Sequence, residues 1–151
     1  MKLWIAMIYL IWSGSAWAVN DAIQIESDKM HMNAQQQRAT FTGGVLLTRN
    51  NFELRCDQLV VDYINDEIKQ AVATGRVRMH QGLKHGASDQ AIFEKKANQV
   101  TLIGHASVED EKGVMRGDKI IHKITEGDTQ VFQKHGEPVR LHIETTTFSH
   151  E

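Results

Sequence analysis

From Ile23 onwards, apolar and polar residues alternate along nearly the whole chain. Ile23 and Ile25 alternate with Gln24 and Glu26, and the same period of two continues in the later segments. The later apolar positions that keep it include Ala39, Phe41, Val45, Leu47, Leu54, Leu59, Val61, Ala71, Ala73, Phe93, Val100, Leu102, Val108, Ile120, Val131, Leu141 and Ile143. Successive side chains of a β-strand point to opposite faces, so this pattern predicts strands with one buried face.

Turn signals separate these segments, for example Asn50-Asn51, Gln81-Gly82 and Glu126-Gly127-Asp128. No stretch keeps a helical period for 12 residues. The pattern therefore predicts an all-β fold with no substantial helix in the mature chain.

A repeat of about 30 residues underlies the alternation. Its markers are aspartates at 28, 57, 89 and 118 and glycines at 43, 75, 104 and 136. The first three glycines each precede the next aspartate by 14 residues. We expect each glycine at a bulge or corner that needs a positive φ, and each aspartate at the other bend of the unit, stabilising the turn before the next strand. A repeat of this length indicates similar units stacked into one elongated structure.

Stacked units with one apolar face must fold over, which places the apolar positions in a trough between two sheets. We expect the inward-pointing residues to include Phe41, Leu47, Leu59, Val61, Phe93, Leu102 and Ile120. Their neighbours Thr40, Val60, Ile92, Thr101 and Ile121 should point the other way. The first strand (23–26) and the last (139–145) would have unpaired edges, which predicts concentration-dependent head-to-tail association.

Residues 1–18 have the pattern of a secretory signal peptide: Lys2, an apolar run from Leu3 to Trp12, and a cleavage site ending at Ala18. The alternative is an uncleaved anchor, but the run is shorter than the roughly 20 residues that span a bilayer. The mature chain would be a single domain, residues 19–151. It would carry 16 Lys and Arg against 19 Asp and Glu, so its composition gives no indication of nucleic-acid binding.

Candidate catalytic and metal-binding residues are scarce. The only cysteine, Cys56, lies in an apolar strand segment and is expected to be buried rather than reactive. The eight histidines lack helical metal-ligand spacings, and we expect them to be solvated or to lie in turns. His122 shares the apolar phase of Ile120, so it is either a satisfied core histidine or a polar group inside the trough. We find no catalytic motif, metal site or cofactor site, and expect a protein that is not an enzyme.

Three segments resemble the LptA/OstA-like family of periplasmic lipopolysaccharide-transport proteins: IQIESDKMHM at 23–32, ATFTGGVLLT at 39–48 and MRGDKIIHKI at 115–124. The resemblance covers about residues 23–143. It implies a twisted, open β-jellyroll whose apolar interior shelters lipid acyl chains. It also implies a periplasmic bridge that passes lipopolysaccharide from the inner to the outer membrane.

The strand parity, the repeat and the resemblance together indicate functional residues, and the resemblance implies the partners. The lipid-binding residues would be Ile23, Ile25, Phe41, Val45, Leu47, Leu59, Val61, Phe93, Leu102, Val108 and Ile120. The partner edge strands would carry Ile23, Ile25, Val139, Leu141 and Ile143. The partners would be a related jellyroll protein of the inner-membrane complex, the N-terminal jellyroll domain of the outer-membrane translocon, and further copies of this chain. The alternative is a structural module of the same fold that pairs through its edges and carries no lipid.

Overall fold

The computed structural model describes residues 22–134 and 136–143, and this part of the chain contains ten strands and no helix. The strands are β1 (Gln24–Glu26), β2 (Lys29–Asn33), β3 (Arg38–Arg49), β4 (Phe52–Ile64), β5 (Glu67–Gln81), β6 (Lys84–Glu94), β7 (Gln99–Asp110), β8 (Gly113–Lys123), β9 (Thr129–Phe132) and β10 (Arg140–Ile143). The all-β prediction is confirmed. The expected signal peptide, its cleavage site after Ala18, and residues 144–145 of the expected last strand lie outside the described residues.

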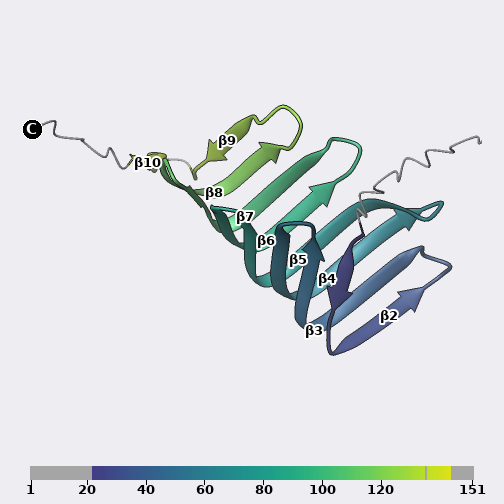
Figure 1. Ribbon diagram of the computed structural model, residues 1–151. Helices are drawn as coiled ribbons and strands as arrows, with labels where there is room; N and C mark the ends of the chain where they lie inside the picture. The colour runs from purple at the N-terminus through teal and green to yellow at the C-terminus, as the bar shows by residue number, and fades with distance from the viewer. Residues whose placement is uncertain (1–21, 135, 144–151) are drawn as a thin grey trace, which may run out of the picture.

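All ten strands belong to one antiparallel sheet, in the order β1-β3-β4-β5-β6-β7-β8-β10, with β2 paired to β3 and β9 paired to β8. The expected trough between two sheets is therefore formed by one sheet, because its long strands bend (Figure 1). The ladders shift register near the middle of these strands, for example between Thr42 and Val45 and between Thr74 and Val77. Each long strand thus has two halves, one on either side of its bend, and the halves on each side form one limb of the folded sheet. The β1 limb is the side that pairs with β1 and β10, and the β2 limb is the side that pairs with β2 and β9.

The bends occur where the repeated glycines lie. Gly43, Gly75 and Gly104 have φ values of 85°, 80° and 78°, and the residue after each also has a positive φ. Two successive positive φ values turn the strand sharply, and they favour glycine at the first position. The expected positive φ is confirmed at these three positions and also at Gly136, whose φ is 95°.

The aspartates do not lie at a separate bend, which corrects the expectation from the sequence. Asp28, Asp57 and Asp89 lie on the strand or segment before each glycine, with their carboxylates against its Cα. Both markers of a unit therefore meet at one corner, because neighbouring strands bend at the same level of the stack. The fourth pair differs: Asp118 accepts a hydrogen bond from the backbone N–H of Lys134 at 2.7 Å, and Gly136 has no close neighbour.

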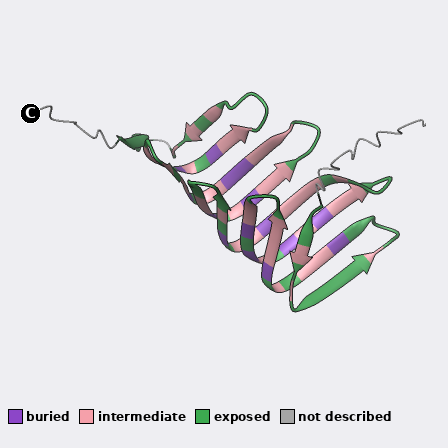
Figure 2. Cartoon of the chain, in the orientation of Figure 1, coloured by how far each residue is buried: buried purple, intermediate pink, exposed green. Residues whose placement is uncertain are grey.

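The two limbs face each other with their apolar sides. A Cβ placed on Gly86 of the β1 limb would lie 3.9 Å from Cδ1 of Leu102 in the β2 limb. Leu54 of the β1 limb and Leu59 of the β2 limb belong to the same buried cluster. Figure 2 shows the buried positions along the middle of the sheet, while β2 and β10 are mostly exposed. The core therefore runs along the crease of the folded sheet, which is the line of bends where the two limbs meet.

Candidate functional site

The inner face consists of cross-strand rows that run from one end of the sheet to the other. In the β2 limb, one row contains Met30, Phe41, Leu59, Ala73, Ala91, Leu102, Ile120 and Val131. The next row contains Met32, Ala39, Val61, Ala71, Phe93, Val100, His122 and Thr129. In the β1 limb, the matching row contains Ile25, Leu47, Leu54, Met79, Gly86, Val108, Met115 and Leu141. The inner face is thus apolar along nearly its whole length.

Burial divides the expected inward residues into two groups. The first group forms the closed core at or near the crease: Val45, Leu59, Val61, Leu102 and Ile120, all at most 6% exposed. The second group is half-buried and packs against this core: Ile25, Phe41, Leu47, Phe93 and Val108. Only the second group offers apolar surface to a ligand without opening the packed crease.

The residues expected to point outward share one row on the opposite face of the β2 limb. Thr40, Val60, Val72, Ile92, Thr101 and Ile121 are successive cross-strand neighbours. Thr101 is only 7% exposed, because Ile92 and Ile121 flank it. Its hydroxyl also accepts a hydrogen bond from the Gln99 side chain at 3.2 Å.

His122 is a polar residue on the inner face, near the β9 end. Its Nδ1 lies 2.9 Å from the hydroxyl oxygen of Thr129, so the half-buried imidazole has a hydrogen-bond partner. Burial lowers the pKa of His122, the positive charge of Lys84 lowers it further, and Asp128 opposes both. Lys84 belongs to the β1 limb, so a charge from the facing limb acts on this histidine.

Each end of the sheet exposes apolar residues beside unpaired strand edges. At one end Met30 and Met32 of β2 are 60% and 56% exposed. At the other end Leu141 and Ile143 of β10 are each 59% exposed. Unpaired edges with apolar side chains are uncommon in proteins that stay monomeric, and they mark sites for strand addition.

The structure places two expected edge residues just outside the strands. Ile23 precedes β1, whose pairing with β3 begins at Gln24, opposite Thr48. Val139 precedes β10, and its partner by register would be Gly117. The chain at Phe132 occupies that position, since its carbonyl oxygen lies close to Gly117. β2 and β9 supply half of each free edge, a position that the alternation of Met30, Met32 and Val131 did not predict.

Cys56 does not present a reactive thiol. Cys56 is 5% exposed, and burial, aided by the charge of Asp57, raises the pKa of its thiol to about 11. No helix in the described residues is long and apolar enough to cross a membrane.

Comparisons with known proteins agree with this architecture. Residues 24–128 match the family described as LptA/(LptD N-terminal domain) LPS transport protein. The chain is 29% identical over 125 residues to the lipopolysaccharide export system protein LptA of Escherichia coli K12, covering 78% of this chain and 68% of that protein. The LptA of Shigella flexneri matches to the same extent.

A solved structure shares the fold. It is LptH, described as the LptA-homologous periplasmic component of the lipopolysaccharide transport device from Pseudomonas aeruginosa. The TM-score is 0.74 at 16% identity, with 83% of this chain and 96% of that chain covered. The fold, the edge strands and the match over most of the strands lead to one conclusion: this chain belongs to the LptA/LptD N-terminal family of non-enzymatic lipopolysaccharide-transport proteins.

Proposed function

We propose that this protein shelters the acyl chains of lipopolysaccharide between its two limbs and passes the lipid along the sheet. The observation that supports this most directly is the continuity of the inner face. Half-buried apolar side chains run from Ile25 in β1 through Leu47 to Val108, and the exposed Leu141 of β10 continues the row. An acyl chain that moves along this row meets apolar surface at nearly every strand.

Binding would require the two limbs to move apart along the side that lies away from the crease. Leu59, Val77 and Ile120 are at most 2% exposed, so the crease has no room for a further chain. Phe93 and Val100 lie one row further from the crease and are half-buried. An acyl chain would therefore contact this row and the Leu47 row of the facing limb. The crease would stay packed and act as a hinge.

We propose that copies of this chain assemble head to tail and so join their inner faces into one longer apolar surface. The β1/β2 end and the β9/β10 end are different surfaces, so their contact repeats rather than closing into a dimer. Met30 and Met32 continue the inner rows to one end, and Leu141 does so at the other. The same ends would receive the related jellyroll of the inner-membrane complex and the N-terminal jellyroll domain of the outer-membrane translocon. The family and the expected signal peptide support a periplasmic location for this bridge.

Site-specific photo-crosslinking tests the proposal. A photoreactive residue at Leu47, on the inner face, should capture lipopolysaccharide, whereas one at the neighbouring Thr48 should not. Equal capture at the two positions would overturn the inner-face assignment. Capture at neither position, with head-to-tail association intact, would favour the second candidate, an interaction module that carries no lipid.

A further inference from the structure

Four ligand-type side chains form one cross-strand row on the outer face of the β1 limb. Glu53 of β4 lies opposite His80 of β5, His80 lies opposite His85 of β6, and His85 lies opposite Glu109 of β7. Their register is one residue away from the inner row of Leu54, Met79, Gly86 and Val108, so they point away from it. The row therefore lies outside the surface assigned to lipid.

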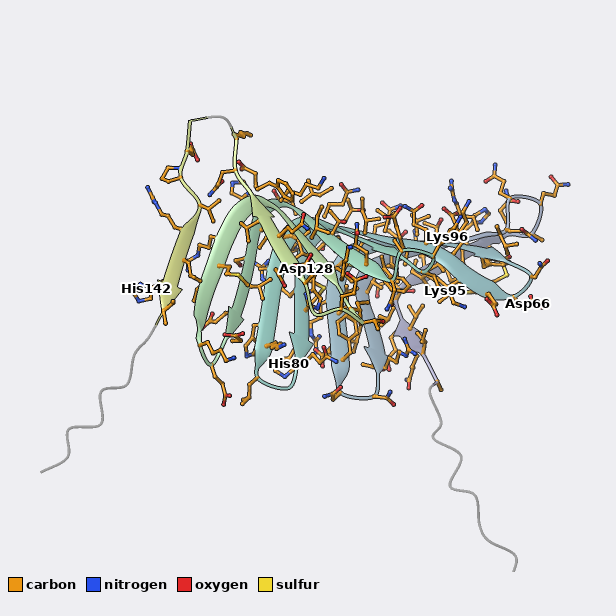
Figure 3. The ribbon with its side chains drawn as sticks, turned by 90° about the horizontal axis from the view of Figure 1, so that it is seen from above. Asp66, His80, Lys95, Lys96, Asp128 and His142 are labelled. Carbon is orange, nitrogen blue, oxygen red and sulfur yellow. The ribbon has the colours of Figure 1, made fainter. Side chains whose placement is uncertain are left out.

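The two histidines are already close together. Their Nδ1 atoms are 3.0 Å apart, a hydrogen bond in which one ring donates its N–H to the bare nitrogen of the other and which a metal ion would replace. Their ring centroids are 4.6 Å apart. They flank the tight turn at Gly82 and Leu83, which fixes them on adjacent strands. Figure 3 shows His80 near the outer side of the β1 limb, where its hairpin turns lie. Asp66 and Lys95 lie at the turns of the β2 limb, away from it. All four side chains of the row line a shallow depression of about 270 Å³.

We propose that His80 and His85 bind a first-row divalent transition-metal ion such as Zn²⁺, with Glu109 as a third ligand. A zinc ion about 2.0–2.1 Å from each imidazole nitrogen, at a tetrahedral angle, separates the nitrogens by about 3.3 Å. The observed 3.0 Å thus needs only a small ring movement. Imidazole nitrogen with carboxylate oxygen is a donor set that suits zinc, copper and nickel.

The third ligand must come from a side-chain rotation. In the part of the chain that the structure describes, no three His, Cys, Asp or Glu side chains are already arranged around a metal position. Glu53 pairs with the Nε of Arg55 at 2.7 Å and would have to give up that bond. Glu109 is exposed and lies directly across from His85, at a separation that a rotated carboxylate can bridge. Glu109 is therefore the better candidate.

Two arginines also line the depression and raise the question of an anion instead. Arg55 is held by Glu53, and Arg78 donates to the carbonyl of Val77 at 2.9 Å. Each arginine thus has a partner elsewhere in the protein, whereas the Nδ1 atoms of the two imidazoles converge on one point and are hydrogen-bonded to each other. This arrangement favours a cation between the imidazoles.

Isothermal titration calorimetry of the purified, chelator-treated protein with Zn²⁺ tests the proposal. We expect binding of one ion per chain. Loss of a supporting group near a metal costs about tenfold in affinity or more, so His80→Asn and His85→Asn, which remove a ligand, should each cost at least about tenfold. Glu109→Gln should weaken binding by a smaller factor, and Glu53→Gln should leave it nearly unchanged.

His31→Asn is the matched control, since His31 is exposed on β2 at the far end of the sheet, and it should bind like the parent. Circular dichroism of each variant checks its fold. Absence of Zn²⁺ binding by the parent protein would overturn the proposal. So would full affinity in the His80→Asn/His85→Asn variant, or binding of inorganic phosphate in place of Zn²⁺. None of these outcomes bears on lipid capture at Leu47, so the two proposals fail separately.

Discussion

The carboxylate of Asp57 lies against the Cα of Gly75 on the neighbouring strand, where any Cβ would collide with it. An ideal Cβ at Gly75 would lie 2.9 Å from the Asp57 Cβ and closer still to a carboxylate oxygen. Asp28 with Gly43 and Asp89 with Gly104 repeat this contact. The repeat in the sequence is thus a repeated corner, at which one strand bends around the aspartate of the strand before it.

Replacing Gly75 with alanine should destabilise the protein by about 2–4 kcal/mol, from its φ of +80° and from the collision with Asp57. Gly82→Ala is the matched control. Gly82 also has a positive φ, +59°, but no atom lies within 4 Å of its added Cβ, so it should cost only about 1 kcal/mol. Urea unfolding of both variants measures the difference.

The collision can be separated from the backbone strain. Adding Asp57→Ala to Gly75→Ala removes the carboxylate, so the pair should be less destabilised than the sum of the single variants by about 1 kcal/mol or more. Additive effects would mean that the contact at this corner contributes nothing.

Acid should weaken the Asp57 corner through its ion pair. Arg76 Nη2 lies 2.7 Å from Asp57 Oδ1, and its hydrogen bonds and charge hold the pKa of Asp57 below the ordinary 3.8, against a smaller effect of burial. A carboxyl group whose pKa is lower in the folded state than in the unfolded state stabilises the fold. This stabilisation is complete above the unfolded-state pKa and is lost as the pH falls through the folded-state pKa. Arg76→Gln should therefore be less stable than the parent at pH 7, and the difference should shrink as the pH falls below the ordinary carboxyl pKa of 3.8.

Urea titrations at several pH values check this. Arg55→Gln removes an arginine from a similarly exposed pair with Glu53 and serves as the control. A gap between Arg76→Gln and the parent that persists undiminished to the lowest pH would contradict the assignment.

Cys56 should be unreactive while the protein is folded. Its thiol is 5% exposed and has a pKa raised to about 11, so at pH 8 little reactive thiolate is present and access is blocked. Ellman's reagent should react slowly without urea and rapidly in denaturing urea. Fast reaction of the folded protein would show that the limbs open widely at the crease.

The alternation allowed the strands and their inward and outward positions to be predicted, because side-chain direction in a strand follows directly from sequence parity. The limb structure could not be predicted in this way. Leu54 and Leu59 both belong to the core, yet they are five residues apart and would point to opposite faces of an unbroken strand. Their separation shows only that an irregularity lies between them. The location of that bend depends on contacts between strands, such as Asp57 against Gly75.

The outer-face histidines show a second limit of the sequence pattern. Metal spacings read from sequence are mostly helical, and His80 and His85 are five residues apart. A search for ligands placed symmetrically about a two-residue turn, here Gly82-Leu83, would have found them. The partners Glu53 and Glu109 come from strands β4 and β7, so only the register brings them alongside.

Removing residues 139–151 should leave a folded monomer that no longer associates head to tail. The deletion removes β10 and with it the exposed Leu141 and Ile143. The core cluster does not include this strand, so the fold should persist. Removing only residues 144–151 keeps β10 and is the control.

Sedimentation velocity over a range of concentrations distinguishes the variants. The parent and the shorter truncation should show a sedimentation coefficient that rises with concentration, and the longer truncation should not. A parent protein that stays monomeric at every concentration would refute edge-to-edge assembly.

The most direct test of the carrier account is methyl NMR with lipopolysaccharide that bears a nitroxide at the end of an acyl chain. Val100 and Val108 report on the inner face of the two limbs, while Val72 and Ile92 report on the outer row of the β2 limb. We predict strong broadening of the Val100 and Val108 methyl signals and little change at Val72 and Ile92. Equal broadening on both faces, or broadening confined to the outer row, would contradict the account.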